Sequence, residues 1–185
     1  YKKTFIIAEI GNNHEGSFST AKKLITEAAN AGVDAVKFQT YNPESFISKK
    51  EKKKLKILKK FHLFKKEIYN LYKFSKSKGL KFISTPLDIE SANFLGKFVD
   101  QFKIASGDND FDELIRTVFR FKKKTIISTG LVKIAKIKNI IKFARQNKFP
   151  LKKLSLLHCV SSYPAENKDL NLNFISSLKK LIDKN

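Results

Sequence analysis

Residues 8 to 17 read AEIGNNHEGS and hold more chemically active side chains than a packed core needs. Two asparagines, a histidine and two carboxylates follow a short apolar run, with Gly11 and Gly16 among them. A carboxylate such as Glu9 can move protons or orient hydroxyl groups. The stretch therefore indicates the rim of a binding or catalytic site.

Five further apolar runs also end in polar residues, namely Lys37, Gln39, Ser84, Thr85, Lys103, Ser106, Asp108, Ser128, Thr129, His158, Ser161, Ser162 and Tyr163. Lysines inside apolar strands are costly to bury without a partner, and a dianionic ligand would satisfy Lys37 and Lys103. The serines can donate hydrogen bonds to phosphate oxygens. Together these residue types favour a site for a phosphorylated anion.

Each member of this set also has a purely structural interpretation. Either lysine could pair with a structural carboxylate, and Ser-Thr at a strand end is often a helix cap. His158 is expected to be a hydrogen-bonded core histidine in the middle of a strand. Tyr163 before Pro164 could be a packing residue of a turn.

The elements that must position these residues follow from the apolar periodicity. Strands are expected at 4–10, 34–39, 80–85, 101–106, 124–129 and 154–160, and helices at 19–32, 61–79, 88–98, 111–121, 134–148 and 172–182. Strict alternation predicts an α/β fold with a parallel sheet, in which the carboxyl ends of the strands share one face. An open doubly wound sheet and a closed barrel both fit this pattern, although no G-x-G-x-x-G follows the first strand.

Residues 41 to 62 interrupt the alternation with a lysine-dense stretch. We expect a solvated excursion there, and the alternative is a mobile basic loop over an anionic ligand.

The composition narrows the class of protein. The chain has 185 residues, 42% of them hydrophobic, and a formal charge of +21. Lysines are spread along the whole chain, which favours solvated faces over a nucleic-acid-binding module, the alternative function from another class. The single cysteine, Cys159, suits a reducing compartment, and no membrane span or signal peptide is visible, so we expect a cytoplasmic protein.

Six motifs resemble, in order and spacing, the sialic acid synthase family: AEIGNNHEGS, VKFQT, FISTP, FKIASGD, IISTG and LLHCVSSYP. The resemblance implies a (β/α)8 TIM barrel, of which about six β/α units are present. It implies condensation of phosphoenolpyruvate with an N-acetylmannosamine-type sugar, giving a nonulosonic acid and phosphate. It also implies a divalent metal, Mn or Mg, and a homodimer in which a C-terminal antifreeze-like domain caps the partner's site.

Site residues carry over by motif. Those that resemble the phosphoenolpyruvate-binding set are Lys37, Thr85, Lys103, Ser106, Ser128 and Ser161, the last standing where some members have asparagine. Positions matching sugar contacts are Glu9, Gln39 and Tyr163. Asp108 matches an acidic position near the reacting centre, so Glu9 and Asp108 are both candidates for acid–base catalysis.

The resemblance also defines what is missing. The family's metal ligands belong to a seventh strand and an eighth region, whereas this sequence stops at Asn185. We therefore expect residues 1–185 to be a partial barrel domain without metal ligands or the antifreeze-like domain, inactive and poorly folded by itself. Neither His14 nor His158 is assigned to a metal, and the acceptor sugar stays open among N-acetylmannosamine, legionaminic-type and pseudaminic-type precursors.

In the implied reaction, C3 of phosphoenolpyruvate attacks the open-chain aldehyde of the sugar, which the metal polarises. Water adds at C2, and the tetrahedral intermediate loses phosphate. A rival enzyme is a Schiff-base keto-acid aldolase with Lys103 or Lys37 as its nucleophile.

Overall fold

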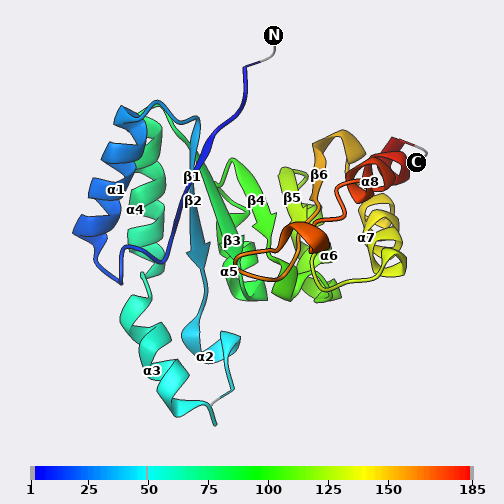
Figure 1. The fold of residues 1–185 in the computed structure, drawn as a ribbon. Coiled ribbons are helices and arrows are strands. Elements are labelled where there is room, and N and C mark those ends of the chain that lie inside the picture. Colours follow the sequence, from blue (N-terminus) through cyan, green and yellow to red (C-terminus); the bar gives the residue numbers. More distant parts are fainter. Residues whose placement is uncertain (1–2, 49, 184–185) are drawn as a thin grey trace. The chain divides into compact units, whose positions relative to one another are not determined.

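Six strands alternate with helices in the computed structural model, which describes residues 3–48 and 50–183 (Figure 1). The strands are β1 (Ile7–Gly11), β2 (Ala35–Thr40), β3 (Lys81–Pro86), β4 (Gln101–Ile104), β5 (Lys124–Ser128) and β6 (Leu154–Leu157). Their order in the sheet equals their order in the chain. A doubly wound sheet reverses its strand order at a switch point, whereas a β/α barrel does not. The predicted α/β class is confirmed, and the strand order decides for the barrel type.

The helices are α1 (Phe18–Asn30), α2 (Pro43–Phe46), α3 (Lys52–Phe61), α4 (Lys65–Ser77), α5 (Ile89–Leu95), α6 (Asp112–Arg120), α7 (Ile134–Gln146) and α8 (Phe174–Asp183). Short 3-10 turns lie at η1 (Ser106–Asp108), η2 (Leu151–Lys153) and η3 (Asn167–Asp169). All six predicted helices are present. Asp88 caps α5 as predicted, through its bond from the Ser91 N–H. No described helix combines the length and the apolar character that a membrane span requires.

The stretch expected to be a solvated excursion, residues 41–62, contains the helices α2 and α3 (Figure 1). Leu55, Leu58 and Phe61 are spaced by three residues and are partly buried on one side of α3, while its lysines are exposed. The density of lysines hid this period in the sequence. Gly16, at φ +80°, approaches the Lys60 carbonyl more closely than any side chain would permit, which explains the glycine in the first loop.

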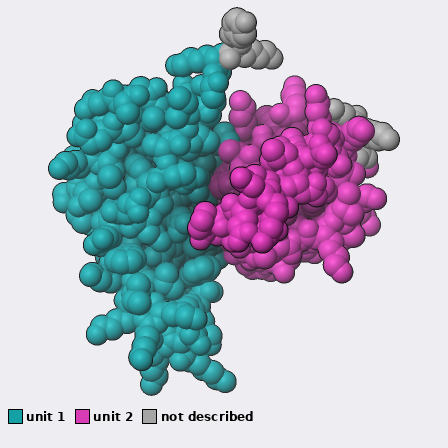
Figure 2. Space-filling model, in the orientation of Figure 1, with its two compact units in different colours: residues 1–101 teal, residues 102–185 magenta. Residues whose placement is uncertain are grey.

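The chain forms two compact units, residues 1–101 and 102–185, shown in teal and magenta in Figure 2. In the first unit, α1 packs against α4, and α4 and α5 pack against β3. Its core includes the stacked rings of Phe38 and Phe82, with centroids 5.3 Å apart. In the second unit, α6 packs against α7, and the rings of Phe119 and Phe149 lie with their centroids 4.5 Å apart. Each unit therefore has its own apolar core.

The first and last strands are less buried than the four strands between them. Only Ile10 is buried among the five residues of β1, and Leu157 at the end of β6 is exposed. These two strands stand at the ends of the strand order, so each has one paired neighbour. An apolar run predicts a strand, but the number of its neighbours sets its burial.

The carboxyl ends of β2 and β3 are held side by side. The parallel register places Gln39 opposite Thr85, and the Leu87 N–H donates to the Thr40 carbonyl at 3.1 Å. On the other side of the strands, the hydroxyl groups of Thr40 and Ser84 lie 2.8 Å apart. This pairing fixes the spacing of the side chains that leave the two strands.

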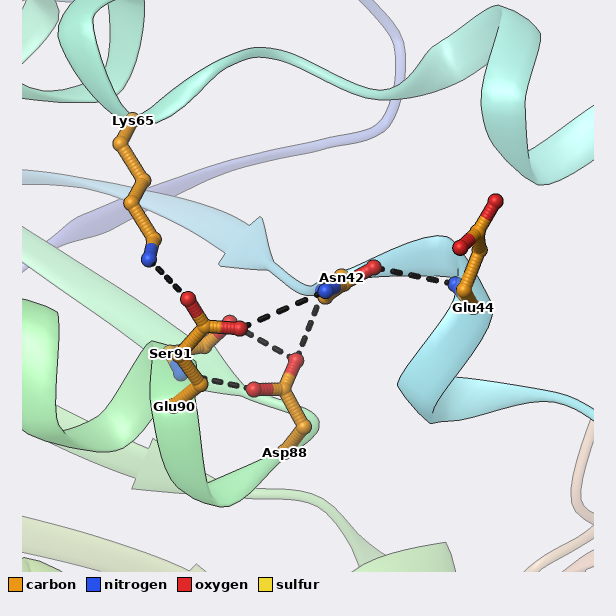
Figure 3. Close-up of polar contacts among 6 residues, drawn as sticks. All are labelled: Asn42, Glu44, Lys65, Asp88, Glu90 and Ser91. Atoms are coloured by element: carbon orange, nitrogen blue, oxygen red, sulfur yellow. Dashed lines mark hydrogen bonds and ion pairs between the residues drawn. The ribbon is translucent and has the colours of Figure 1, made fainter.

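A buried carboxylate locks the segments that follow these strands (Figure 3). Asp88 accepts hydrogen bonds from the Ser91 N–H at 2.7 Å, the Ser91 hydroxyl at 2.8 Å and the Asn42 N–H at 2.7 Å. The Asn42 amide also donates to Glu90, which pairs with Lys65. Asp88 therefore caps α5 and fixes the start of α2 at the same time.

We predict that Asp88→Ala lowers the free energy of unfolding by about 2–3 kcal/mol, because three donors lose a charged acceptor. Urea denaturation of the protein measures this loss. Glu27→Ala, on the exposed face of α1, is the matched control and should change the value by no more than about 0.5 kcal/mol. Equal stability of the two variants would contradict the locking role.

Candidate active site

In the first unit, the predicted anion-binding lysine makes an ion pair. Lys37 on β2 is buried, and its Nζ lies 3.0 Å from Glu9 Oε2 and 3.4 Å from Thr85 Oγ1. Strand register produces this contact, because Glu9 on β1 stands opposite Lys37. The alternative that Lys37 pairs with a carboxylate is thus confirmed. Three predicted site residues come together here, and Glu9, with a side chain 61% exposed, keeps access to solvent.

The orientation of Gln39 depends on Asn12, whose role the sequence did not reveal. Asn12 Nδ2 donates to Gln39 Oε1 at 2.9 Å. An amide oxygen that already accepts a bond leaves the Gln39 Nε2 group as the donor for other partners. Asn12 belongs to the AEIGNNHEGS stretch, so its type was noted, but only the pairing of β1 with β2 shows which side chain it contacts.

His14 has a structural environment. The ring is buried, stacks on Phe38 with centroids 5.9 Å apart, and accepts the Gly16 N–H at Nδ1. Burial lowers the pKa of His14, so the ring is neutral at physiological pH. Acceptance at Nδ1 places the proton on Nε2, which has no partner in the described part of the chain.

A separate cavity of about 450 Å³ in the first unit does not involve the predicted residues. It is lined by Thr40, Tyr41, Asn42, His62, Leu63, Phe64, Lys65, Lys66, Glu90 and Ser91. Successive side chains of a strand point to opposite faces. Lys37 and Gln39 therefore leave β2 on the side opposite to Thr40, away from this cavity.

In the second unit, Lys103 on β4 is the centre of the polar residues. Its buried Nζ donates to Ser128 Oγ at 2.5 Å and to the Ile104 carbonyl at 2.7 Å. These bonds link the end of β4 to the end of β5. Lys103 and Ser128, which were predicted from separate motifs, are therefore direct partners.

Two more predicted residues meet above Gly130, the glycine of the IISTG motif. A Cβ added to Gly130 would lie 2.5 Å from Ser161 Oγ and 2.8 Å from Ser106 Oγ. Both hydroxyl groups thus converge where a glycine leaves room. Hydroxyl groups next to an ammonium group suit the oxygens of a phosphate.

Asn109 is a further residue of this region that the sequence did not single out. It is 1% exposed, and its amide donates to the carbonyls of Ser128 at 2.9 Å and Gly130 at 2.8 Å. It follows Asp108 in the motif FKIASGDND. In the sequence, its position next to predicted site residues was the one indication that Asn109 belongs to this region.

The surroundings of Asp108 shift the pKa of its carboxyl group. Burial is the main cause that raises the pKa of its carboxyl group, and the negative charge of Asp110 adds to it, while Lys103 opposes the shift. A carboxyl group with a raised pKa is suited to hold a proton and release it during a reaction.

Two predicted residues lie apart from these clusters. The Tyr163 side chain is 99% exposed, and the structure does not bring it to the other site residues. The position of His158 in the middle of a strand is wrong, because β6 ends at Leu157. Its predicted hydrogen bonding is confirmed, since Nε2 lies 2.6 Å from the Leu170 carbonyl. Nowhere within residues 3–48 and 50–183 do three His, Cys, Asp or Glu side chains gather as metal ligands, so these residues do not fit a metal site.

We predict that Asp108→Asn raises the melting temperature at pH 7 by about 1–3 °C, because it removes a partly buried charge. The pKa of Asp108 is higher in the folded protein than in the unfolded protein, where it is about 3.9. As the pH rises through these two pKa values, the carboxylate forms and lowers the stability of the fold. The gain should therefore shrink as the pH falls toward 4. Thermal melts over this range test it, with Asp169→Asn as the exposed control; an Asp108→Asn protein that melts below wild type at pH 7 would refute the argument.

The chain is similar to proteins that are named as legionaminic acid and sialic acid synthases. It is 42% identical to an uncharacterised protein of Methanocaldococcus jannaschii, over 97% of this chain and 53% of that protein. It is 35% identical to the N,N'-diacetyllegionaminic acid synthase of Campylobacter jejuni, over 96% of this chain and 58% of the synthase. The chain spans about half the length of the curated relatives it matches.

A solved structure agrees with this relationship. The sialic acid synthetase of Leptospira borgpetersenii, in complex with citrate, superposes with a TM-score of 0.88 at 36% identity, over 97% of this chain and 62% of that one. The fold is therefore that of a TIM barrel, of which six β/α units are present. The NeuB family pattern matches residues 24–184, and the chain belongs to the NeuB family.

Proposed function

We propose that the protein condenses phosphoenolpyruvate with an N-acetylmannosamine-type sugar to give a nonulosonic acid and phosphate. Two contacts in the second unit carry the proposal: Lys103 Nζ donates to Ser128 Oγ, and the Ser106 and Ser161 hydroxyls converge on Gly130, two residues after Ser128. Three hydroxyl groups and one buried ammonium group suit a phosphate dianion. Family membership, the predicted motifs and the names of the relatives all support the same reaction class.

The chain's own residues would act mainly by binding and orientation. Lys103 and the three serines of the second unit bind the phosphate of phosphoenolpyruvate. Lys37 and Thr85 of the first unit remain predicted phosphoenolpyruvate-binding residues, on the basis of their motifs. C3 then bonds to the sugar aldehyde carbon, and its oxygen takes a proton. Water adds at C2 and loses one proton, which leaves a hydroxyl group on C2. The C2–O bond to phosphate then breaks, the departing phosphate takes the proton of that hydroxyl group, and the 2-keto acid remains. No step of this scheme depends on a metal held by the described residues.

The structure favours Asp108 over Glu9 as the acid. Glu9 is engaged in the ion pair with Lys37. Asp108 has a raised pKa and so keeps a proton more readily. We propose that Asp108 supplies the proton to the aldehyde oxygen, and that Glu9 orients Lys37 and a sugar hydroxyl.

For the acceptor sugar we propose contacts to Gln39 and Tyr163. Gln39 Nε2 is left as a donor by Asn12, so it suits an acceptor oxygen such as an acetamido carbonyl. The Tyr163 ring is exposed and would have to acquire its contact in the complex. We propose further that the protein is a cytoplasmic homodimer. We also propose that it uses Mn²⁺ or Mg²⁺, bound by residues other than those described here.

Phosphate release by the full-length protein tests the function directly. Release should require both phosphoenolpyruvate and a 2-acetamido mannose-type sugar, and Lys103→Ala should lower kcat/KM at least ~100-fold through loss of a buried charged donor. Release only with short phosphorylated aldoses would point to a different acceptor class. Borohydride in the presence of a keto acid should trap no imine; covalent trapping on Lys103 or Lys37 would support the aldolase instead.

We predict that Gly130→Ala reduces phosphoenolpyruvate turnover at least ~10-fold, because the new methyl group displaces the Ser106 and Ser161 hydroxyls. The melting temperature should change little, since a serine can adopt another rotamer. Gly107→Ala is the matched control, because an added Cβ there meets nothing within 4 Å. Unchanged turnover of Gly130→Ala would exclude a role of these hydroxyls in phosphate binding.

A further inference from the structure

The turn at residues 128–131 is held from one side by a single buried amide. Asn109 Nδ2 donates to the carbonyls of Ser128 and Gly130, so both of its N–H groups are directed at the same turn. Asn109 is 1% exposed, which excludes water as a competing partner. Both N–H groups of the Asn109 amide are engaged by the turn, so the effect of these donors on the reaction passes through the turn.

The bond to Ser128 fixes the peptide unit between β5 and the turn. In this trans peptide the Ser128 carbonyl faces Asn109, and the Thr129 N–H points the opposite way, to the Leu157 carbonyl at 2.9 Å. The peptide plane is therefore clamped at both ends. Its orientation sets the direction of the Ser128 side chain, whose hydroxyl accepts the Lys103 ammonium proton.

The bond to Gly130 fixes a second peptide unit that is under strain. Leu131 has φ +67°, in the left-handed region that a branched side chain disfavours. Its side chain is 78% exposed, so packing does not impose this conformation. The hydrogen bond from Asn109 to the Gly130 carbonyl imposes it, because the φ of Leu131 helps set the direction of that carbonyl. Strained backbone held by its surroundings is typical of ligand-binding turns.

We infer that Asn109 is the positioning residue of the phosphate-binding turn, a role that rests on the proposed function. It keeps Ser128 Oγ at Lys103 and Gly130 beneath the hydroxyls of Ser106 and Ser161. Without it, the 130–131 peptide relaxes out of its strained conformation and the oxygen-binding groups lose their alignment. Affinity for phosphoenolpyruvate falls, while affinity for the sugar is kept, because Gln39 is held by Asn12 and Tyr163 is exposed.

The test compares Asn109→Ala with Asn147→Ala in the full-length protein. Asn147 is the matched control, because its amide also donates to a backbone carbonyl, that of Phe143, but at the end of α7. We expect the KM for phosphoenolpyruvate to rise at least ~10-fold in Asn109→Ala, with the KM for the sugar changed less than ~2-fold. Asn147→Ala should change both KM values less than ~2-fold, even if its melting temperature falls as far as that of Asn109→Ala.

Two further measurements keep the inference testable. Asn109→Ser retains one short donor and should give an intermediate KM, which serves if Asn109→Ala does not fold. Calorimetric titration with phosphoenolpyruvate alone reports binding without turnover, and its Kd should rise in parallel. Equal KM values for phosphoenolpyruvate in Asn109→Ala and Asn147→Ala would overturn the positioning role and leave the proposed function standing. A wild-type protein that neither binds nor consumes phosphoenolpyruvate would remove the proposed function itself.

Discussion

The buried ammonium group of Lys103 is the constraint on which the polar structure of the second unit depends. A charged group out of contact with water must be surrounded by oxygen atoms. Ile104 and Ser128 supply two of them, so the ends of β4 and β5 have to meet at fixed positions. The turn after β5 then needs its own support, and the buried amide of Asn109 provides it. One charge thus determines the arrangement of two strand ends and a turn.

The two strand lysines meet the same requirement in different ways. Lys37 is neutralised by Glu9, a carboxylate that remains open to solvent. Lys103 donates to a hydroxyl and a carbonyl oxygen, which carry no charge. An anion at Lys37 would therefore compete with Glu9, whereas an anion at Lys103 would meet an ammonium group that already donates to the Ser128 hydroxyl.

The opening loop shows how closely site and fold are linked. Gly16 permits close contact with the backbone at Lys60, and His14 packs as a neutral ring on Phe38. In the same stretch, Glu9 pairs with Lys37, and Asn12 donates to Gln39. Part of this stretch of polar residues therefore stabilises its own conformation, because a loop must be rigid to position a side chain accurately.

The sequence by itself determined the α/β class, the six strand–helix units and the residue types at the strand ends. These follow from local periodicity, and the parallel arrangement brings the carboxyl ends together. Tertiary structure alone decided the strand order, the helix α3 hidden among lysines, and the partner of each polar group. Glu9 pairs with Lys37 through strand register, and Asn109 reaches residues 19 and 21 positions away. Such pairings depend on how distant segments pack, and no local pattern encodes them.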